Sequence, residues 1–254
     1  MKIYNNLRLR PSEFGKVVSG LDKPNLTEKQ SETLAELMAK DKRTDAQERN
    51  LAELIAKRDA MPELSTGAKT YIREMVKSDF LKYTDTLENK YLEKGILCEN
   101  EAIEFLNNYH FKNYTKFPEG AYSNEWLVSR GCDIKDELIT RDTKCSWSKK
   151  THPTNWKDAY DSLYEWQGRC YMNLFGSKVH YVDHVLVNTP EHLIPKYEDT
   201  SLHNMDGLTM EQRYTSIKFD FSKDLDEIIP LAVQLCREYA NEYLNDIFYN
   251  NKNY

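Results

Sequence analysis

The sequence is poor in the residues and runs that mark several protein classes. Nine glycines and eight prolines among 254 residues exclude collagen-like and low-complexity chains. No stretch approaches the roughly 20 apolar residues that a membrane-spanning helix requires. The first ten residues lack the apolar block and the small-residue cleavage site of a secretory signal. We therefore expect a cytoplasmic protein with no membrane segment.

Cysteine is also scarce, and its spacing excludes two kinds of site. The five cysteines are an odd number, lie far apart and form no C-x-x-C pair. This spacing disfavours zinc ribbons and disulfide scaffolds. We expect small buried thiols in a reducing compartment. They are Cys98, Cys132, Cys145, Cys170 and Cys236.

Charge is distributed unevenly along the chain. The formal net charge is −6, which argues against a generally basic protein. Residues 141–157, however, carry five basic side chains and one acidic one, whereas residues 220–254 carry seven acidic and three basic ones. The charge that lines a cleft matters more to a polyanionic ligand than the total charge. The first of these segments is therefore a candidate for such a contact.

Residues 24–60 contain a near-repeat that predicts two helices. T-L-A-E-L-M-A-K-D at 33–41 is followed by N-L-A-E-L-I-A-K-R at 50–58. Each copy is amphipathic, and Thr27 and Thr44 stand where helix caps belong. The pattern indicates an inserted helical hairpin, which is either a solvated lobe or an arm that grips DNA or a partner.

The rest of the chain predicts helices packed on a mixed sheet. Helical spacing of apolar residues covers four long segments, and β-prone runs lie between them. The expected helices are 64–83, 86–109, 155–176 and 222–248, and the expected strands are 126–134, 138–147, 178–188 and 215–221. The first two strands form a hairpin with a three-residue loop. This order is typical of an α/β or α+β fold, with residues 1–254 forming a single domain.

The predicted hairpin brings together two carboxylates and a lysine. Asp133 ends the first strand, and Asp142, Thr143 and Lys144 lie in the second. Side chains at i and i+2 share a face of a strand, so Asp142 and Lys144 point the same way. Hard carboxylate oxygens bind Mg²⁺, which suits phosphodiester hydrolysis. The alternative is an ordinary ion pair on the surface of a sheet.

Four motifs in chain order resemble the PD-(D/E)xK nuclease superfamily, in particular its phage lambda exonuclease and RecB-type branches. The hairpin G-C-D-I…D-T-K-C-S-W is similar to the family's metal-binding hairpin. K-G-I-L-C-E-N-E-A-I at 94–103 is similar to its G-x-x-x-E-x-x-A helix, and Gln167 with Tyr171 is similar to its Q-x-x-x-Y motif. The segment L-R-L-R-P-S-E-F-G-K-V-V at 7–18 is similar to its Arg…Ser-Glu segment.

The chain departs from the family pattern within the hairpin. Cys132 stands where the family usually has proline, and Ile134 stands where it often has glycine. Asp142 replaces the commoner glutamate. Both carboxylates are retained, so the departures leave the metal-binding chemistry possible and leave the hairpin register open by about one residue.

The resemblance implies a metal site and a set of catalytic residues. Asp133, Asp142 and the backbone carbonyl of Thr143 would hold one divalent ion, and Glu99 would complete that site or hold a second ion. Lys144 would orient or activate the attacking water. The implied cofactor is Mg²⁺, for which Mn²⁺ would substitute.

A second implied pair of side chains lies on the helix that follows the hairpin. Gln167 would steady Lys144 or the water through its amide. Tyr171, on the same helix face, would either reach a phosphate or pack as a core aromatic.

Further residues are implied or indicated as DNA contacts. Arg10 and Ser12 are candidates for a terminal-phosphate pocket, or are simply a solvated arginine and a helix cap. Lys149 and Lys150 follow the catalytic strand and suit the positive lining of a DNA groove, although a solvated loop would look the same.

The function implied by the resemblance is DNA hydrolysis from duplex ends. The expected protein has a restriction-endonuclease-like core and degrades one strand of a DNA end in the 5′ to 3′ direction. Its expected partners are a single-strand annealing protein and further copies of itself in a trimeric ring, in a host cytoplasm if a phage encodes it. The alternatives are an endonuclease, a single-strand-preferring RecB-type nuclease, or a non-catalytic helical interaction protein.

Overall fold

A computed structural model describes the chain except for residues 1–2, 22, 85–88 and 250–254. The described helices are α1 (Pro11–Phe14), α2 (Glu28–Met38), α3 (Asp45–Arg58), α4 (Thr66–Leu81), α5 (Lys90–His110), α6 (Trp156–Ala159), α7 (Ser162–Phe175) and α8 (Leu225–Tyr249). The strands are β1 (Tyr122–Ser123), β2 (Val128–Ser129), β3 (Ile134–Asp136), β4 (Ile139–Cys145), β5 (Val179–Val185) and β6 (Tyr214–Asp220). Short 3₁₀ turns lie at Ile3–Asn6, Glu191–Leu193, Thr200–Leu202 and Glu211–Arg213.

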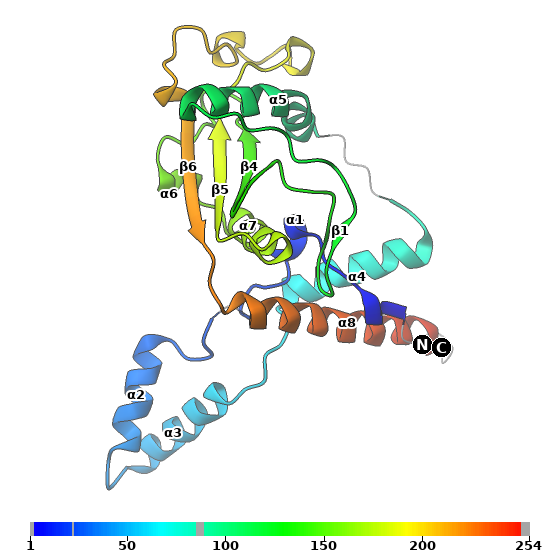
Figure 1. The fold of residues 1–254 in the computed structure, drawn as a ribbon. Coiled ribbons are helices and arrows are strands. Elements are labelled where there is room, and N and C mark those ends of the chain that lie inside the picture. Colours follow the sequence, from blue (N-terminus) through cyan, green and yellow to red (C-terminus); the bar gives the residue numbers. More distant parts are fainter. Residues whose placement is uncertain (1–2, 22, 85–88, 250–254) are drawn as a thin grey trace.

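The fold is mixed α/β, as the sequence predicts. Four strands form the central sheet in the order β3-β4-β5-β6, in which β4 and β5 are parallel and the outer pairs are antiparallel. The parallel connection runs through α7, which crosses back over the sheet (Figure 1). β1 and β2 form a separate two-stranded sheet.

Helices cover both faces of the central sheet. On one face, α5 packs its buried residues against Ile134 and Val185. On the other face, α7 approaches β5 so closely that a Cβ at Gly168 would lie 2.1 Å from Cδ2 of His180. Beneath α7, helices α1, α4 and α8 form the larger apolar core, and α8 runs along that side of the molecule (Figure 1). Because side chains alternate along β4, its two faces meet two different helices.

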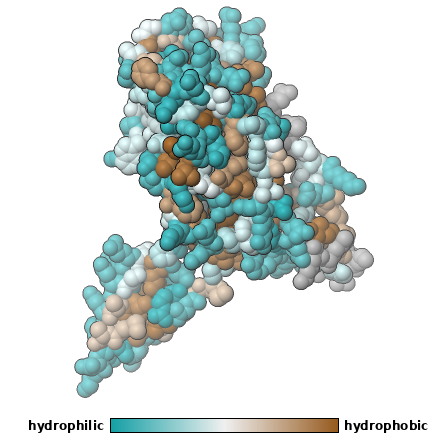
Figure 2. Space-filling model, viewed as in Figure 1, coloured by the Kyte–Doolittle hydropathy of each residue, from teal (hydrophilic) through white to brown (hydrophobic). Residues whose placement is uncertain are grey.

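Helices α2 and α3 form the hairpin that the near-repeat predicts. Thr27 and Thr44 each make a full capping box, with Gln30 and Gln47 respectively. The two helices pack through a small leucine cluster of their own, which includes Leu34 and Leu51. Figure 1 shows the hairpin extending away from the sheet, and Figure 2 shows an apolar stripe along it bordered by hydrophilic side chains.

The structure corrects the predicted catalytic hairpin. Residues 126–134 are not one strand, because Gly131 at a φ of 139° turns the chain between β2 and β3. Asp136 pairs with Ile139, so the loop has two residues rather than three. Glu137, the first residue of this loop, has a φ of 47°, and the favoured two-residue hairpin turns require a positive φ at that position.

Two predicted helices also differ in detail. The segment 155–176 is two helices, because the chain is extended at Tyr160 and the Asp161 side chain caps α7 afresh at the Leu163 N–H. The apolar spacing of 86–109 predicts a buried stripe of Leu87, Tyr91, Ile96, Ala102, Ile103 and Leu106. In α5 the last three are buried as predicted, but Tyr91 and Ile96 are exposed. The predicted Leu87 lies outside the described residues.

No described helix combines the length and the apolar character needed to span a membrane.

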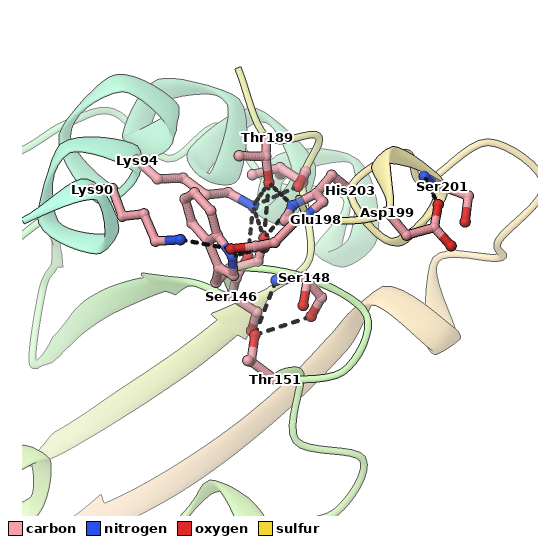
Figure 3. A network of polar contacts seen from close by, with 12 residues as sticks. Lys90, Lys94, Ser146, Ser148, Thr151, Thr189, Glu198, Asp199, Ser201 and His203 are labelled. Atoms are coloured by element: carbon pink, nitrogen blue, oxygen red, sulfur yellow. Dashed lines mark hydrogen bonds and ion pairs between the residues drawn. The ribbon is translucent and has the colours of Figure 1, made fainter. Parts of the chain in front are cut away.

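A buried lysine fastens α5 to the ends of the sheet (Figure 3). Lys94 has no exposed surface. Its ammonium donates to the carbonyls of Ser146, Val187 and Trp147, at 2.6, 3.0 and 3.2 Å, and to Oγ1 of Thr189 at 2.8 Å. Burial lowers the pKa of this ammonium. One side chain therefore joins the helix to the segments that follow two parallel strands.

The same network extends to the loop before β6. Glu198 accepts hydrogen bonds from Lys90 at 2.7 Å and from the Trp147 indole at 2.9 Å. The ring of His203 lies 3.1 Å from the same carboxylate (Figure 3). These contacts hold the first turns of α5, which form one wall of the site described below.

Candidate active site

Asp133 and Asp142 lie side by side at the open end of the β3–β4 hairpin, away from its turn. The β3–β4 register places Ile134 opposite Arg141, so the next positions outward are Asp133 and Asp142. Oδ2 of Asp133 accepts a hydrogen bond from the Thr143 backbone N–H at 2.6 Å and another from its hydroxyl at 2.7 Å. The hairpin thus holds the Asp133 carboxylate against the D-T-K segment of β4.

The negative charge of Asp142 disfavours ionisation of Asp133. Burial and, after it, the charge of Asp142 raise the pKa of Asp133 to about 7, against the lowering effect of the two Thr143 hydrogen bonds. Asp142 itself is only 4% exposed. A cation between them would relieve the repulsion, because it would favour the charged form of both groups.

Lys144 lies on the same face of β4 as Asp142. Its ammonium makes an ion pair with Asp142 and lies 3.4 Å from Oε1 of Gln167. Burial would lower the pKa of Lys144, but the charge and hydrogen bond of Asp142 outweigh it and raise the pKa. The ring of Tyr164 stacks over the ammonium at 4.5 Å. Lys144 is therefore held as a cation beside the carboxylates.

Glu99 reaches the same place from α5. A cavity of about 430 Å³ is lined by Glu99, Asp133, Asp142 and Lys144, with apolar residues of α5 along one wall. A second cavity of about 190 Å³ adjoins it and shares Glu99 and Asp133. The structure thus brings together all four of the acidic and basic side chains that the resemblance implies for the centre of the site.

The donor set fits a hard divalent cation. No group of three His, Cys, Asp or Glu side chains is gathered closely enough to enclose a metal ion within the part of the chain that the structure describes. Mg²⁺ does not need such a cage, because it commonly binds through one or two carboxylates and retains several waters. The adjacent carboxylates of Asp133 and Asp142 meet that requirement.

Gln167 and Tyr171 connect this centre to a third cavity. Both side chains are buried, and Nε2 of Gln167 donates to the Tyr171 hydroxyl at 3.3 Å. Tyr171 lines a cavity of about 400 Å³ together with Arg10 and Ser12. Ser12 is not a helix cap, since Arg10 occupies the cap position of α1 and its side chain does not bond the helix. Arg10, Ser12 and Tyr171, which are all candidates for contact with a phosphate, therefore line one cavity.

Lys149 and Lys150 lie elsewhere. The ammonium of Lys149 donates to the Ser201 carbonyl at 3.0 Å, and the backbone N–H of Lys149 donates to the Leu202 carbonyl. Neither lysine lines the three cavities described above. The structure does not bring this pair to the carboxylates, because the chain turns away after β4.

Sequence reasoning misses three residues of the site. Lys116 forms an ion pair with Glu99 at 2.8 Å, Arg130 lines both the Glu99 and the Arg10 cavities, and Tyr164 covers Lys144. Lys116 lies outside every expected element, and Arg130 lies within the run 126–134 that is expected to be one strand, so no local pattern marks either as a site residue. Tyr164 follows helical spacing and is indistinguishable from a core aromatic.

Comparison with known proteins finds likeness at the level of the fold. No family model matches the sequence, and no curated protein matches it. The structure is similar to a phage-related exonuclease from Haemophilus somnus 129PT, with a TM-score of 0.73 and 23% identity, covering 95% of this chain and 97% of that one. It is also similar to LHK-Exo in complex with dAMP, with a TM-score of 0.50 and 14% identity over 95% of this chain and 94% of that one. Both chains match nearly from end to end.

Proposed function

We propose that this protein is a metal-dependent DNA exonuclease of the PD-(D/E)xK type that acts on duplex ends. The observation that carries the proposal is the β3–β4 register, which places Asp133 beside Asp142 and leaves Lys144 on the same face. The likeness of the fold to exonucleases supports the same conclusion. One of those neighbours binds dAMP, and we propose that deoxynucleotides are the products here.

The proposed metal ion is Mg²⁺, with Mn²⁺ as a substitute. Asp133, Asp142 and the backbone carbonyl of Thr143 would hold it, and Glu99 is the further carboxylate in reach of the same cavity. When bound, such an ion polarises a phosphoryl oxygen and lowers the pKa of a water. Thr143 keeps one oxygen of Asp133 fixed by two hydrogen bonds, which orients the other toward the cavity.

Lys144 and Gln167 would position the attacking water. The ammonium has three donors, of which Asp142 and Gln167 engage two, so one remains for a water or a phosphate oxygen. The Gln167 amide is fixed in turn by Tyr171, so the lysine is held on both sides. A preorganised donor of this kind stabilises charge that develops on the phosphoryl group.

The Arg10 and Ser12 cavity would take the terminal phosphate of the DNA end. A guanidinium fork and a hydroxyl both suit phosphate oxygens, and the cavity is linked to the carboxylate site through Tyr171, which is hydrogen-bonded to Gln167. A 5′-phosphate held there would make degradation proceed 5′ to 3′. We further propose a role in phage-type recombination, in which a single-strand annealing protein receives the product strand and a trimeric ring encloses the duplex.

The test is degradation of defined DNA by the purified chain. Linear duplexes with and without a 5′-phosphate are compared with a covalently closed circle, in Mg²⁺ and in chelator. In Mg²⁺, but not in chelator, we expect the 5′-phosphorylated strand of the linear duplex to be degraded. The closed circle should not be cut. Cutting of the circle would indicate an endonuclease instead.

Two variants test whether the carboxylates and lysine do the chemistry. Asp142→Asn and Lys144→Ala should each lower the rate on the order of a hundredfold or more, because each removes a group that acts on the transition state. Lys149→Ala, just beyond β4, is the matched control. Unchanged degradation by both variants would show that the proposed mechanism at these residues is wrong.

A further inference from the structure

Lys116 is a fifth charged group at the carboxylate site. It lies in the segment 111–121, between α5 and β1, and its ammonium is 2.8 Å from Oε2 of Glu99. Lys116, Glu99 and Asp133 line the same cavity of about 190 Å³. The ammonium therefore occupies space beside two of the three carboxylates.

The backbone around Lys116 is fixed to the catalytic hairpin. The N–H of Phe117 donates to the carbonyl of Asp133 at 2.8 Å, and that of Gly120 donates to the carbonyl of Arg130 at 2.9 Å. The Phe117 ring packs in turn against Phe175 of α7 at 5.4 Å between ring centres. Lys116 is thus delivered to Glu99 by a segment that is bonded to the hairpin immediately after it, and not by a free loop.

Two of the three carboxylates already form ion pairs, Glu99 with Lys116 and Asp142 with Lys144. Glu99 pairs with Lys116, and only 18% of the Glu99 side chain is exposed. Asp133 and Asp142 belong to the hairpin, where Thr143 orients the former. Lys116 balances the charge of Glu99 as Lys144 balances that of Asp142, so that among the described residues Asp133 is the one of these three carboxylates that forms no ion pair. Glu99 therefore has its counter-ion within the chain.

We propose that Lys116 occupies the second cation position of this site, so that the enzyme holds one divalent ion at Asp133 and Asp142 while Glu99 stays paired with the lysine. The proposal rests on the proposed metal-dependent function and specifies its metal count. Removal of the ammonium would free Glu99, which would then bind a second ion together with Asp133.

The test counts Mn²⁺ bound to the full chain by electron paramagnetic resonance of the free ion, without DNA. We expect one ion per chain for the unmodified protein and two for Lys116→Met. Lys112→Met is the matched control, since Lys112 is an exposed lysine of the same segment, and it should bind one ion. The double variant Glu99→Gln with Lys116→Met should return to one ion.

The possible results separate this inference from the proposed function. One ion for Lys116→Met, or two for the unmodified protein, would overturn the role of Lys116 and leave the nuclease proposal standing. No bound ion in any of the proteins would overturn both. Lys116→Gln provides a second variant of the same position, and thermal denaturation in chelator verifies that each protein is folded, which a 41% exposed side chain should permit.

Discussion

Thr143 donates two hydrogen bonds, from its backbone and its hydroxyl, to a single oxygen of Asp133. This contact joins the residue before β3 to the middle of β4, and it fixes the Asp133 carboxylate before any ligand binds. It also sets the Asp133 oxygen close to Asp142, with consequences for stability as well as for function.

Without metal, Asp133 should make the folded protein less stable as the pH rises. Its pKa is about 7 in the folded chain, above its usual value near 3.8, so between these values the folded state binds more protons than the unfolded state. Stability is therefore lost as the pH rises from about 4 to 7. Relative to the unmodified protein, Asp133→Asn should gain about 2 kcal/mol of unfolding free energy between pH 5 and pH 8.

The measurement is urea denaturation in chelator at several pH values. Asp136→Asn, in the same hairpin, is the control and should follow the unmodified protein. A pH-independent difference between Asp133→Asn and the unmodified protein would contradict the raised pKa. Added Mg²⁺ should stabilise the unmodified protein more than Asp133→Asn, because the ion binds the charged form.

Lys94 should be a large contributor to stability. Lys94→Met removes the donor to three backbone carbonyls and to the Thr189 hydroxyl, all in the interior. We expect a loss of about 3 kcal/mol in urea denaturation, since buried acceptors are left without partners. Lys90→Met, on the same helix but at the surface, should cost far less. Equal losses for the two variants would refute this role.

Gly168 should not tolerate a side chain. A Cβ there would overlap the ring of His180, which is buried and held by the Thr140 hydroxyl at 3.0 Å. Gly168→Ala should therefore destabilise the protein by about 2–3 kcal/mol through overpacking. Gly67→Ala, where the nearest atom is 3.9 Å away, should be neutral or slightly stabilising because alanine favours the helix. Thermal denaturation of the pair measures the difference.

Arg10 should govern the preference for a phosphorylated end. Arg10→Ala removes the charge from the cavity that Ser12 and Tyr171 also line. We expect the KM for 5′-phosphorylated duplex to rise about tenfold or more, with kcat little changed, because a charged hydrogen bond is lost. With 5′-hydroxyl DNA the variant and the unmodified protein should be alike. Arg8→Ala, two residues away and bonded to Ser123, is the control.

Gln167 should act through Lys144. Gln167→Leu removes the acceptor of the ammonium and the donor to Tyr171. We expect kcat to fall roughly tenfold with KM unchanged, since the lysine is misplaced only at the reacting centre. Tyr171→Phe removes the hydroxyl alone and should have a smaller effect. A rise in KM with constant kcat would show that Gln167 binds DNA instead.

Much of the candidate site could be predicted because its residues follow local periods. Asp142 and Lys144 share a strand face, and Gln167 and Tyr171 share a helix face, whatever the surrounding structure. The apolar pattern predicts one loop residue too many in the hairpin, since Gly131 and Glu137 shape the chain through backbone conformations that such patterns do not record. It likewise does not predict the exposure of Tyr91 and Ile96, because helical spacing alone does not say which stripe faces the sheet.

The strand and helix periods, the helix caps and the order of the acidic, basic and amide residues follow from the sequence, because each depends on neighbours within a few positions. The placement of Glu99 and Asp133 in one cavity, the ion pair of Lys116 with Glu99 and the attachment of α5 to the sheet through Lys94 arise only in the folded chain. Those contacts join segments distant in the chain. They exist only once burial has closed the intervening loops and made each buried charge require a partner.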